Sequence, residues 1–176
     1  MLGLKCFSQT KFEREHRIKK SQFPSINMDS LPFENTKYIR YYREVDTSKI
    51  TYTLKFKKGK MQYHIDYNEK GALQNTGFMV KEVDIPTDTY ARIRSELNSN
   101  FQKTKIKYIQ QCYLGSSENV LKNTFQNLIL PSNTYKVMVR GNKTEKREDY
   151  IAIFDAEGNL EHMARALPPN YDHVLY

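Results

Sequence analysis

The sequence has no tryptophan, only two cysteines, seven scattered glycines and no long apolar run. A transmembrane helix needs about 18 to 20 consecutive apolar residues, so none is expected. The two cysteines exclude a disulfide-rich scaffold, and if Cys6 leaves with a leader, Cys112 is expected to be a buried, inert thiol. The glycines form no phosphate-binding loop and no nucleophile elbow, which argues against the enzymes that use those motifs.

The residues that are present favour a folded protein rich in β-sheet. Over 176 residues, 39% are hydrophobic and 27% are charged, as in ordinary globular domains. Thirteen Tyr and nine Phe favour strands, where a ring packs and a hydroxyl stays hydrated. The net charge is +8, and half of it lies in the first twenty residues, where six Lys and Arg face two Glu. The remaining positive charge is dispersed, which argues against a nucleic-acid partner.

The first nine residues resemble the end of a secretory signal peptide. Cys6 and Ser8 would occupy the small-residue positions before a cleavage site at Gln9, although the apolar part is too short to function as written. The sequence therefore predicts a periplasmic or secreted protein whose signal peptide is truncated at the N-terminus. The alternative is a frayed end. Residues 1–22 are interpreted as a leader remnant followed by a basic arm.

One turn motif occurs twice. Residues 67–73 and 154–160 both read aromatic, Asn or Asp, any residue, charged, Gly, any residue, Leu. Such a motif predicts a β-hairpin corner, in which Asn or Asp caps the turn and Gly takes the left-handed conformation. Two copies with similar flanks suggest an internal duplication.

The hydrophobic pattern predicts the other elements. Apolar and polar residues alternate over 50–57 and 61–67, as in half-buried strands, and a strand over 73–83 is expected to carry a bulge at Gly77. Apolar residues at three- and four-residue spacing predict one helix over 88–101. Further strands are predicted over these ranges: 38–45, 105–113, 135–140, 149–154 and 160–167.

These elements predict an α+β fold made by tandem duplication of a helix plus a four-stranded antiparallel meander sheet, with the helices on one sheet face. The first unit would cover residues 23–84. The second would cover 85–167, with an insertion at 114–133, and residues 168–176 would form a tail. Similar Pro-containing segments, at 23–25 and 85–87, would open the two helices.

The paired units, these segments and the Tyr-rich strands ending in Asn/Asp-x-x-Gly-x-Leu resemble the PepSY-like family over residues 23–167. That family shares its fold with the β-lactamase-inhibitor proteins, and many members are short secreted proteins of Bacteroidetes. The chain departs from the family at Pro32, which shortens the first helix, and at the insertion. The resemblance implies an extracytoplasmic, non-enzymatic module that binds or inhibits another protein.

The sheet faces suggest where binding would occur. In the first unit, the face opposite the core, with Thr53, His64, Asp66 and Thr76, is expected to be hydrated. In the second unit, an apolar centre with a basic rim is typical of a partner-binding patch. The alternative is that the insertion at 114–133 covers this face. The candidate partner-binding residues are Met138, Ile151, Ile153 and Met163, with Lys136, Arg140 and Arg165 around them.

No residue is assigned a catalytic, metal-binding or cofactor-binding role. His64 and Asp66 would lie on one strand face, but no third ligand occurs at a suitable spacing. The leading hypothesis is a non-enzymatic binding module for an unknown protein or cell-envelope component. The alternative is an envelope accessory protein that binds an anionic polymer or lipid surface through Lys and Arg.

Overall fold

The computed structural model of the chain describes residues 15–27, 31, 33–46, 49–115, 118–143 and 146–166. Within these residues the backbone forms nine strands, two α-helices and two short 3-10 helices. No helix in this part of the chain is long and apolar enough to cross a membrane. In chain order the elements are β1 (His16–Ile18), η1 (Lys20–Gln22), β2 (Thr36–Asp46), β3 (Lys49–Lys58), β4 (Met61–Tyr67), β5 (Leu73–Val80), η2 (Glu82–Asp84), α1 (Thr87–Asn100), β6 (Thr104–Leu114), α2 (Glu118–Phe125), β7 (Asn133–Asn142), β8 (Arg147–Phe154) and β9 (Leu160–Arg165).

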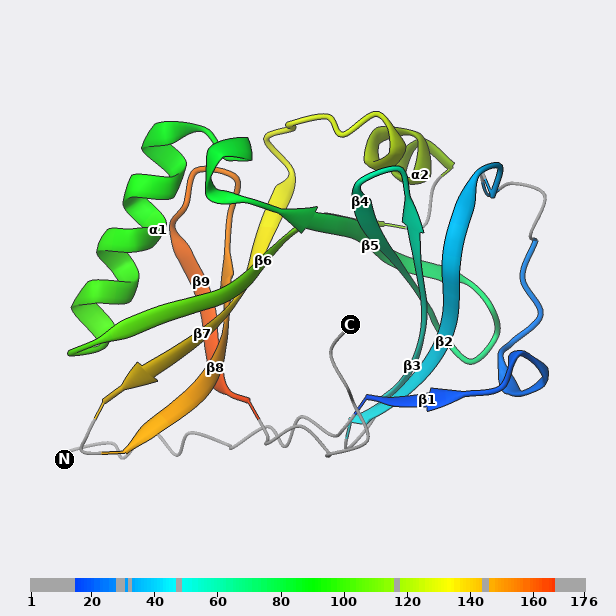
Figure 1. The fold of residues 1–176 in the computed structure, drawn as a ribbon, viewed down its shortest axis with the longest axis horizontal. Coiled ribbons are helices and arrows are strands. Elements are labelled where there is room, and N and C mark those ends of the chain that lie inside the picture. Colours follow the sequence, from blue (N-terminus) through cyan, green and yellow to red (C-terminus); the bar gives the residue numbers. More distant parts are fainter. Residues whose placement is uncertain are drawn as a thin grey trace, which may run out of the picture.

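All nine strands belong to one antiparallel sheet, in the spatial order β1 to β9. Each strand pairs with the next one along the chain, and β5 pairs with β6 although α1 lies between them in sequence. Figure 1 shows this sheet bent into an arch, with α1 and α2 on its outer side. We call the outer side the convex face and the inner side the concave face.

The tandem duplication of a helix plus a four-stranded meander predicted from the sequence is therefore wrong. The β5–β6 pairing makes one continuous sheet across the boundary expected at residues 84 and 85. Before β2, the helical part of the described residues is the three-residue η1, and no α-helix is present there. The predicted helix at 88–101 does exist, as α1 over Thr87–Asn100.

Both predicted hairpin corners are present and share one hydrogen-bond pattern. Asn68 Oδ1 accepts from the backbone N–H groups of Lys70 and Ala72, each at 2.9 Å. Asp155 Oδ1 accepts from Glu157 N at 2.9 Å and Asn159 N at 2.8 Å. The glycines Gly71 and Gly158 have φ of 76° and 91°, the left-handed conformation that a side chain disfavours.

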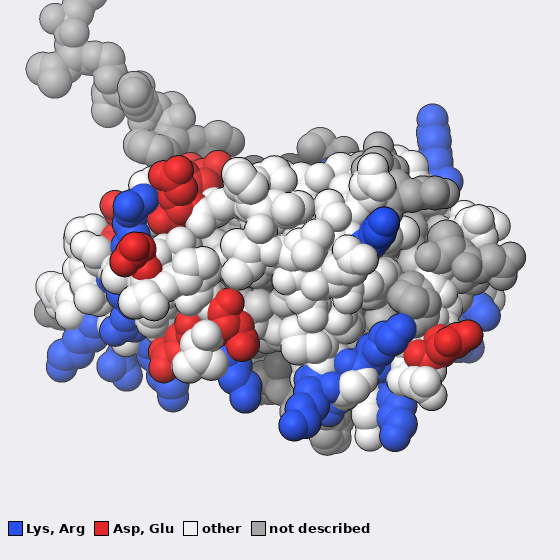
Figure 2. All heavy atoms as spheres, turned by 90° about the horizontal axis from the view of Figure 1, so that it is seen from above, with Lys and Arg blue, Asp and Glu red and all other residues white. Residues whose placement is uncertain are grey.

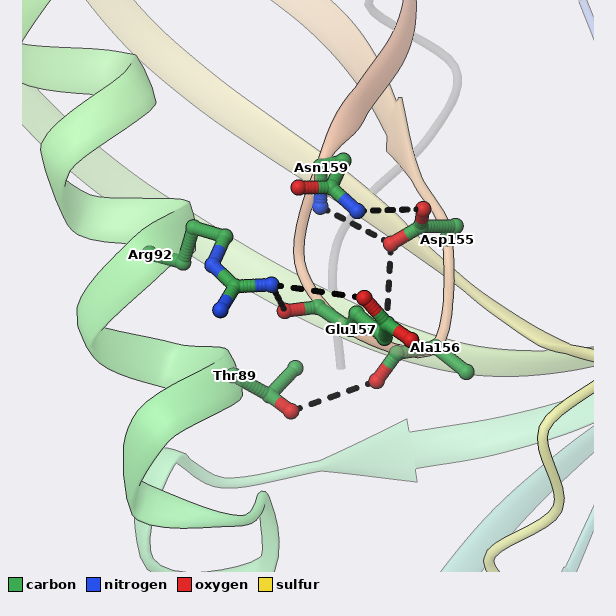
Figure 3. Close-up of polar contacts among 6 residues, drawn as sticks. All are labelled: Thr89, Arg92, Asp155, Ala156, Glu157 and Asn159. Atoms are coloured by element: carbon green, nitrogen blue, oxygen red, sulfur yellow. Dashed lines mark hydrogen bonds and ion pairs between the residues drawn. The ribbon is translucent and has the colours of Figure 1, made fainter.

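Helix α1 holds the second corner in place. Thr89 Oγ1 donates to the carbonyl oxygen of Ala156 at 3.2 Å, and the Arg92 guanidinium donates to the carbonyl of Glu157 at 3.2 Å, as Figure 3 shows. A Cβ on Gly158 would lie 2.5 Å from the carbonyl oxygen of Thr89. The glycine is therefore required by close helix contact as well as by the turn.

The core lies on the convex face. Alternate residues of every strand from β3 to β8 project there, among them Leu54, Ile65, Val137 and Phe154, each 0% exposed. Helix α1 adds Ile93 and Leu97, also fully buried. Burying these side chains contributes roughly 1.5–3 kcal/mol each, so this face supplies much of the stability.

The first half of the convex face is covered by two other segments. Phe23 packs edge-on against Tyr41, with ring centroids 5.1 Å apart, and also against Tyr52 and Tyr67. Helix α2 places Phe125 5.3 Å from the Tyr63 ring and 6.2 Å from Phe56. The alternative in which 114–133 covers the opposite face is therefore wrong for the described residues of that segment, because α2 packs on the core side.

Local register shifts correct two further expectations. The bulge in the β4–β5 pair lies between Asp66 and Tyr67, so Gly77 pairs regularly and is not a bulge. The same shift turns Thr76 toward the convex face, where it is 0% exposed rather than hydrated. Glycine is needed at position 77 for a different reason. A Cβ there would lie 2.7 Å from the His64 ring and 2.3 Å from the Gln111 carbonyl oxygen.

Candidate binding face

Cross-strand partners in an antiparallel sheet project to the same side, so the register defines the concave face. One row across it contains Met79, Gln110, Lys136, Ile153 and His162. A neighbouring row contains Tyr108, Met138, Ile151 and Ala164. Toward β2, further rows place these side chains on the same face: Arg17, Tyr42, Thr53, Asp66, Asn75, Arg40, Lys55, His64 and Cys112.

A polar cluster occupies the middle strands of this face. Asp66 accepts a hydrogen bond from Thr53 Oγ1 at 2.8 Å and another from Asn75 Nδ2 at 3.0 Å. The imidazole of His64 lies over Gly77, which leaves room for the ring because it has no Cβ. The prediction that His64 and Asp66 share a face is correct, but Thr53 and His64 are buried, at 5% and 6% exposure, and not hydrated.

Burial sets the protonation states of this cluster. It lowers the pKa of His64 to about 4, even though Asp66 acts in the opposite direction, so the ring is neutral at pH 7. Burial raises the pKa of the Cys112 thiol to about 12. Cys112 Sγ lies 4.0 Å from His64 Nε2. The pair is therefore a neutral thiol beside a neutral imidazole, and the expectation of a buried, unreactive Cys112 fits its environment.

Lys136 is a cation at the centre of this face that makes no close ion pair within the described part of the chain. Its ammonium has no carboxylate within 4.0 Å and no hydrogen-bond partner among the described residues. Burial acts to lower the pKa of Lys136, but the charges of Asp66 and Glu44 help to raise it above its ordinary value. The ammonium therefore stays positive although it is half-buried, because acidic groups beyond 4.0 Å outweigh the effect of burial.

An apolar patch lies next to this ammonium. Ile153 pairs directly with Lys136, and Met138 pairs with Ile151 in the adjacent row. All three apolar side chains are half-buried rather than widely exposed. We call Lys136, Met138, Ile151 and Ile153 the central patch.

The structure brings together five of the seven candidate residues predicted from the sequence and separates the other two. Arg140 shares the concave face with the central patch. Met163 pairs with Ala152 and Arg165 pairs with Tyr150, so both lie on the convex side. The reason is a register shift between Ile153 and Phe154, which reverses the alternation along β9. Placing Met163 and Arg165 in the patch was wrong.

Ion pairs surround the central patch at a distance. Asp149 accepts from Arg140 Nε at 2.8 Å and from Lys107 Nζ at 2.6 Å. The two cations lower the pKa of Asp149 by more than burial raises it. Across the face, Lys55 Nζ lies 2.6 Å from Glu15 Oε2. The Lys136 ammonium makes no such pair with a described residue.

Two neighbours of the patch were missed by sequence reasoning. Tyr108 pairs with Met138, at the start of the regular stretch that follows the register shift after Ile106. Gln110 pairs with Lys136 and places its amide nitrogen 3.5 Å from His64 Nδ1. Which strand lies beside β6, and in which register, depends on pairing between segments distant in sequence, so the sequence alone did not place these two side chains beside the patch.

The side chains of this face limit the kinds of chemistry that it could support. Within the described ranges, no three His, Cys, Asp or Glu side chains come together in a way that could hold a metal ion. The neutral His64–Cys112 pair is buried and lacks the low-pKa thiolate of a cysteine nucleophile. What the face does offer is an unpaired cation next to apolar side chains on a rigid sheet.

Comparison with known proteins bears on the fold alone. No family model and no curated protein matches the chain. Among solved structures, the crystal structure of a DUF2874 family protein from Bacteroides ovatus is similar, with a TM-score of 0.50 and 10% sequence identity. The similarity covers 76% of this chain and 79% of that one. At this identity the likeness concerns backbone architecture and transfers no activity.

Proposed function

We propose that this protein is a non-enzymatic binding module that holds a partner protein or cell-envelope component through the central patch of the concave face. The observation that carries the proposal is the Lys136 ammonium, which is half-buried without a carboxylate within 4.0 Å among the described residues. A partner carboxylate placed against it would satisfy this charge while apolar partner groups covered Met138, Ile151 and Ile153.

Two further parts of the proposal rest on the sequence. The leader-like residues 1–9, which lie outside the described residues, support a periplasmic or secreted location. The PepSY-like resemblance supports a module without catalytic activity, possessing a binding surface in place of an active site. Both remain proposals.

Replacing Ile153 by Asp tests the proposal. The new carboxylate would lie opposite Lys136, so it would pair with the ammonium and make the apolar patch polar. Envelope extract of the source organism is passed over wild-type protein and over Ile153→Asp. We expect the wild type to retain a partner protein, and the amount retained by the variant to be at least tenfold lower. The circular dichroism spectrum and thermal unfolding of the variant should stay close to those of the wild type.

The matched control is Ser95→Asp on the exposed side of α1, which adds the same charge to the other side of the molecule. It should retain the partner. If Ile153→Asp captures the same proteins, the central patch is not the binding surface. If it unfolds, Ile153 is a core residue and the proposal also fails.

The second candidate, binding of an anionic polymer or lipid surface through Lys and Arg, has support in the distribution of charge. Figure 2 shows Lys and Arg side chains gathered along the lower edge of that view, with few charges across its centre. Salt separates the two candidates. Attraction between exposed charges weakens as the Debye length falls from about 10 Å at 0.1 M to about 3 Å at 1 M salt, whereas apolar contact persists.

A further inference from the structure

A basic groove lies at the β1 edge of the sheet, away from the central patch. Strand β1 pairs with Tyr41, Tyr42 and Arg43, so among the described residues the start of β2 has no strand partner on that side. The chain then turns away through η1. Between this turn and β2 lies a groove of about 660 Å³.

The groove is lined by four cations and no acid. The cations are Arg17, Lys19, Lys20 and Arg40, and the other lining residues, Ile18, Gln22, Ile39 and Tyr41, are uncharged. No carboxylate lies within 4.0 Å of these four cations in the described part of the chain. Four like charges around one hollow repel each other, so an anion bound among them would relieve this repulsion.

The groove is held by structure on both sides. Gln22 Oε1 accepts from Lys19 N at 2.9 Å, and Gln22 N donates back to the Lys19 carbonyl at 3.0 Å, which closes the η1 turn. Phe23 anchors that turn against Tyr41 at 5.1 Å. The cationic side chains therefore start from a fixed backbone, which reduces the ordering cost of binding.

We propose that this groove is a binding site for a compact oxyanion of several negative charges, of the pyrophosphate or polyphosphate class. Two guanidinium groups offer paired donors that match phosphate oxygens, and two ammonium groups supply point charges beside them. The volume accommodates a short phosphate chain and is too small for a folded partner. This site is independent of the central patch, and it would give the second candidate function a defined location.

Titration calorimetry with sodium pyrophosphate and tripolyphosphate tests the site. We expect wild-type protein to bind both, with tighter binding of the longer chain. The double variant Arg17→Gln/Arg40→Gln should bind at least tenfold more weakly. The control Lys60→Gln/Lys105→Gln removes two exposed charges elsewhere and should bind within about twofold of wild type at moderate salt, because distant exposed charges are screened.

Circular dichroism and thermal unfolding must show that the groove variant is folded. The proposal is overturned if neither phosphate compound binds below millimolar concentration, or if the folded groove variant binds as the control does.

A parallel experiment uses vesicles containing phosphatidylglycerol. Binding of pyrophosphate without binding of vesicles supports the groove and rejects the lipid-surface function; vesicle binding that survives the groove variant rejects the groove as its site.

Discussion

At the residue scale, the most informative contact is that between His64 and Gly77. A Cβ on residue 77 would lie only 2.7 Å from Cε1 of the His64 ring, so glycine is what allows the ring to pack there. This fit removes the imidazole from water and leaves it beside Cys112 and Gln110. The sequence indicated that His64 and Asp66 share a face, but it could not show the depth of burial, which depends on contacts between strands distant in sequence.

This burial predicts an acid-sensitive stability. The pKa of His64 is lowered from its ordinary 6.5 to about 4, so the unfolded chain binds a proton at a pH where the folded protein does not. Stability should therefore fall as pH drops from about 6.5 toward 4, at up to about 1.4 kcal/mol per pH unit. The variant His64→Gln lacks this titrating group. Between pH 7 and pH 5, the drop in unfolding free energy should therefore be about 2 kcal/mol smaller for the variant than for the wild type.

Urea denaturation at both pH values measures the effect. The control His16→Gln changes an exposed histidine on β1 and should keep the wild-type acid sensitivity. An equal loss of stability in wild type and His64→Gln would show that His64 is not held neutral by the fold.

At the element scale, α2 covers part of the convex face over the first half of the sheet, where the described residues before β2 form no α-helix. Val120, Leu121 and Phe125 are apolar, but their local sequence does not show which face of the sheet the segment packs against. Phe125 packs beside Tyr63 and Phe56, and Tyr63 OH donates to Asn127 just beyond the helix, at 3.2 Å. A segment interpreted as an insertion is thus part of the core.

Shortening Phe125 should therefore destabilise the whole protein. We expect Phe125→Ala to cost roughly 2–4 kcal/mol, since Phe125 is only partly buried and full truncation of a buried Phe costs about 3–5 kcal/mol. Chemical denaturation measures the difference. Leu114→Ala, at an exposed position, is the control and should change stability by less than about 0.5 kcal/mol. A small effect at Phe125 would mean that α2 is only loosely attached to the sheet.

Bulges explain most of the disagreement between sequence and structure at this scale. Strict alternation placed Thr76, Met163 and Arg165 on the concave face, and each lies beyond a register shift that reverses the side on which residues project. By contrast, Met138, Ile151 and Ile153 lie on stretches without a shift, and their shared face was predicted correctly. The turn residues were also predicted correctly, because Asn68, Asp155 and their glycines act locally.

At the scale of the whole molecule, the sheet separates two tasks. The convex face carries both α-helices (Figure 1) and the core, while the concave face presents the central patch on strands that pack against that core. Single exposed apolar residues such as Val83 and Leu114, at 80% and 67% exposure, lie on different elements and form no comparable surface. The sequence predicted two separate four-stranded units, whereas the pairing of β5 with β6 joins all nine strands into one sheet.

Site-specific photocrosslinking tests the central claim most directly. A photoreactive phenylalanine analogue is placed at Ile151 in the central patch, or at the highly exposed Val83 in η2, and the protein is illuminated in envelope extract. We expect a discrete crosslinked partner from Ile151, lost when Lys136→Met is added, and none from Val83. Crosslinks from Val83 alone, or identical crosslinks from both positions, would contradict a partner-binding concave face.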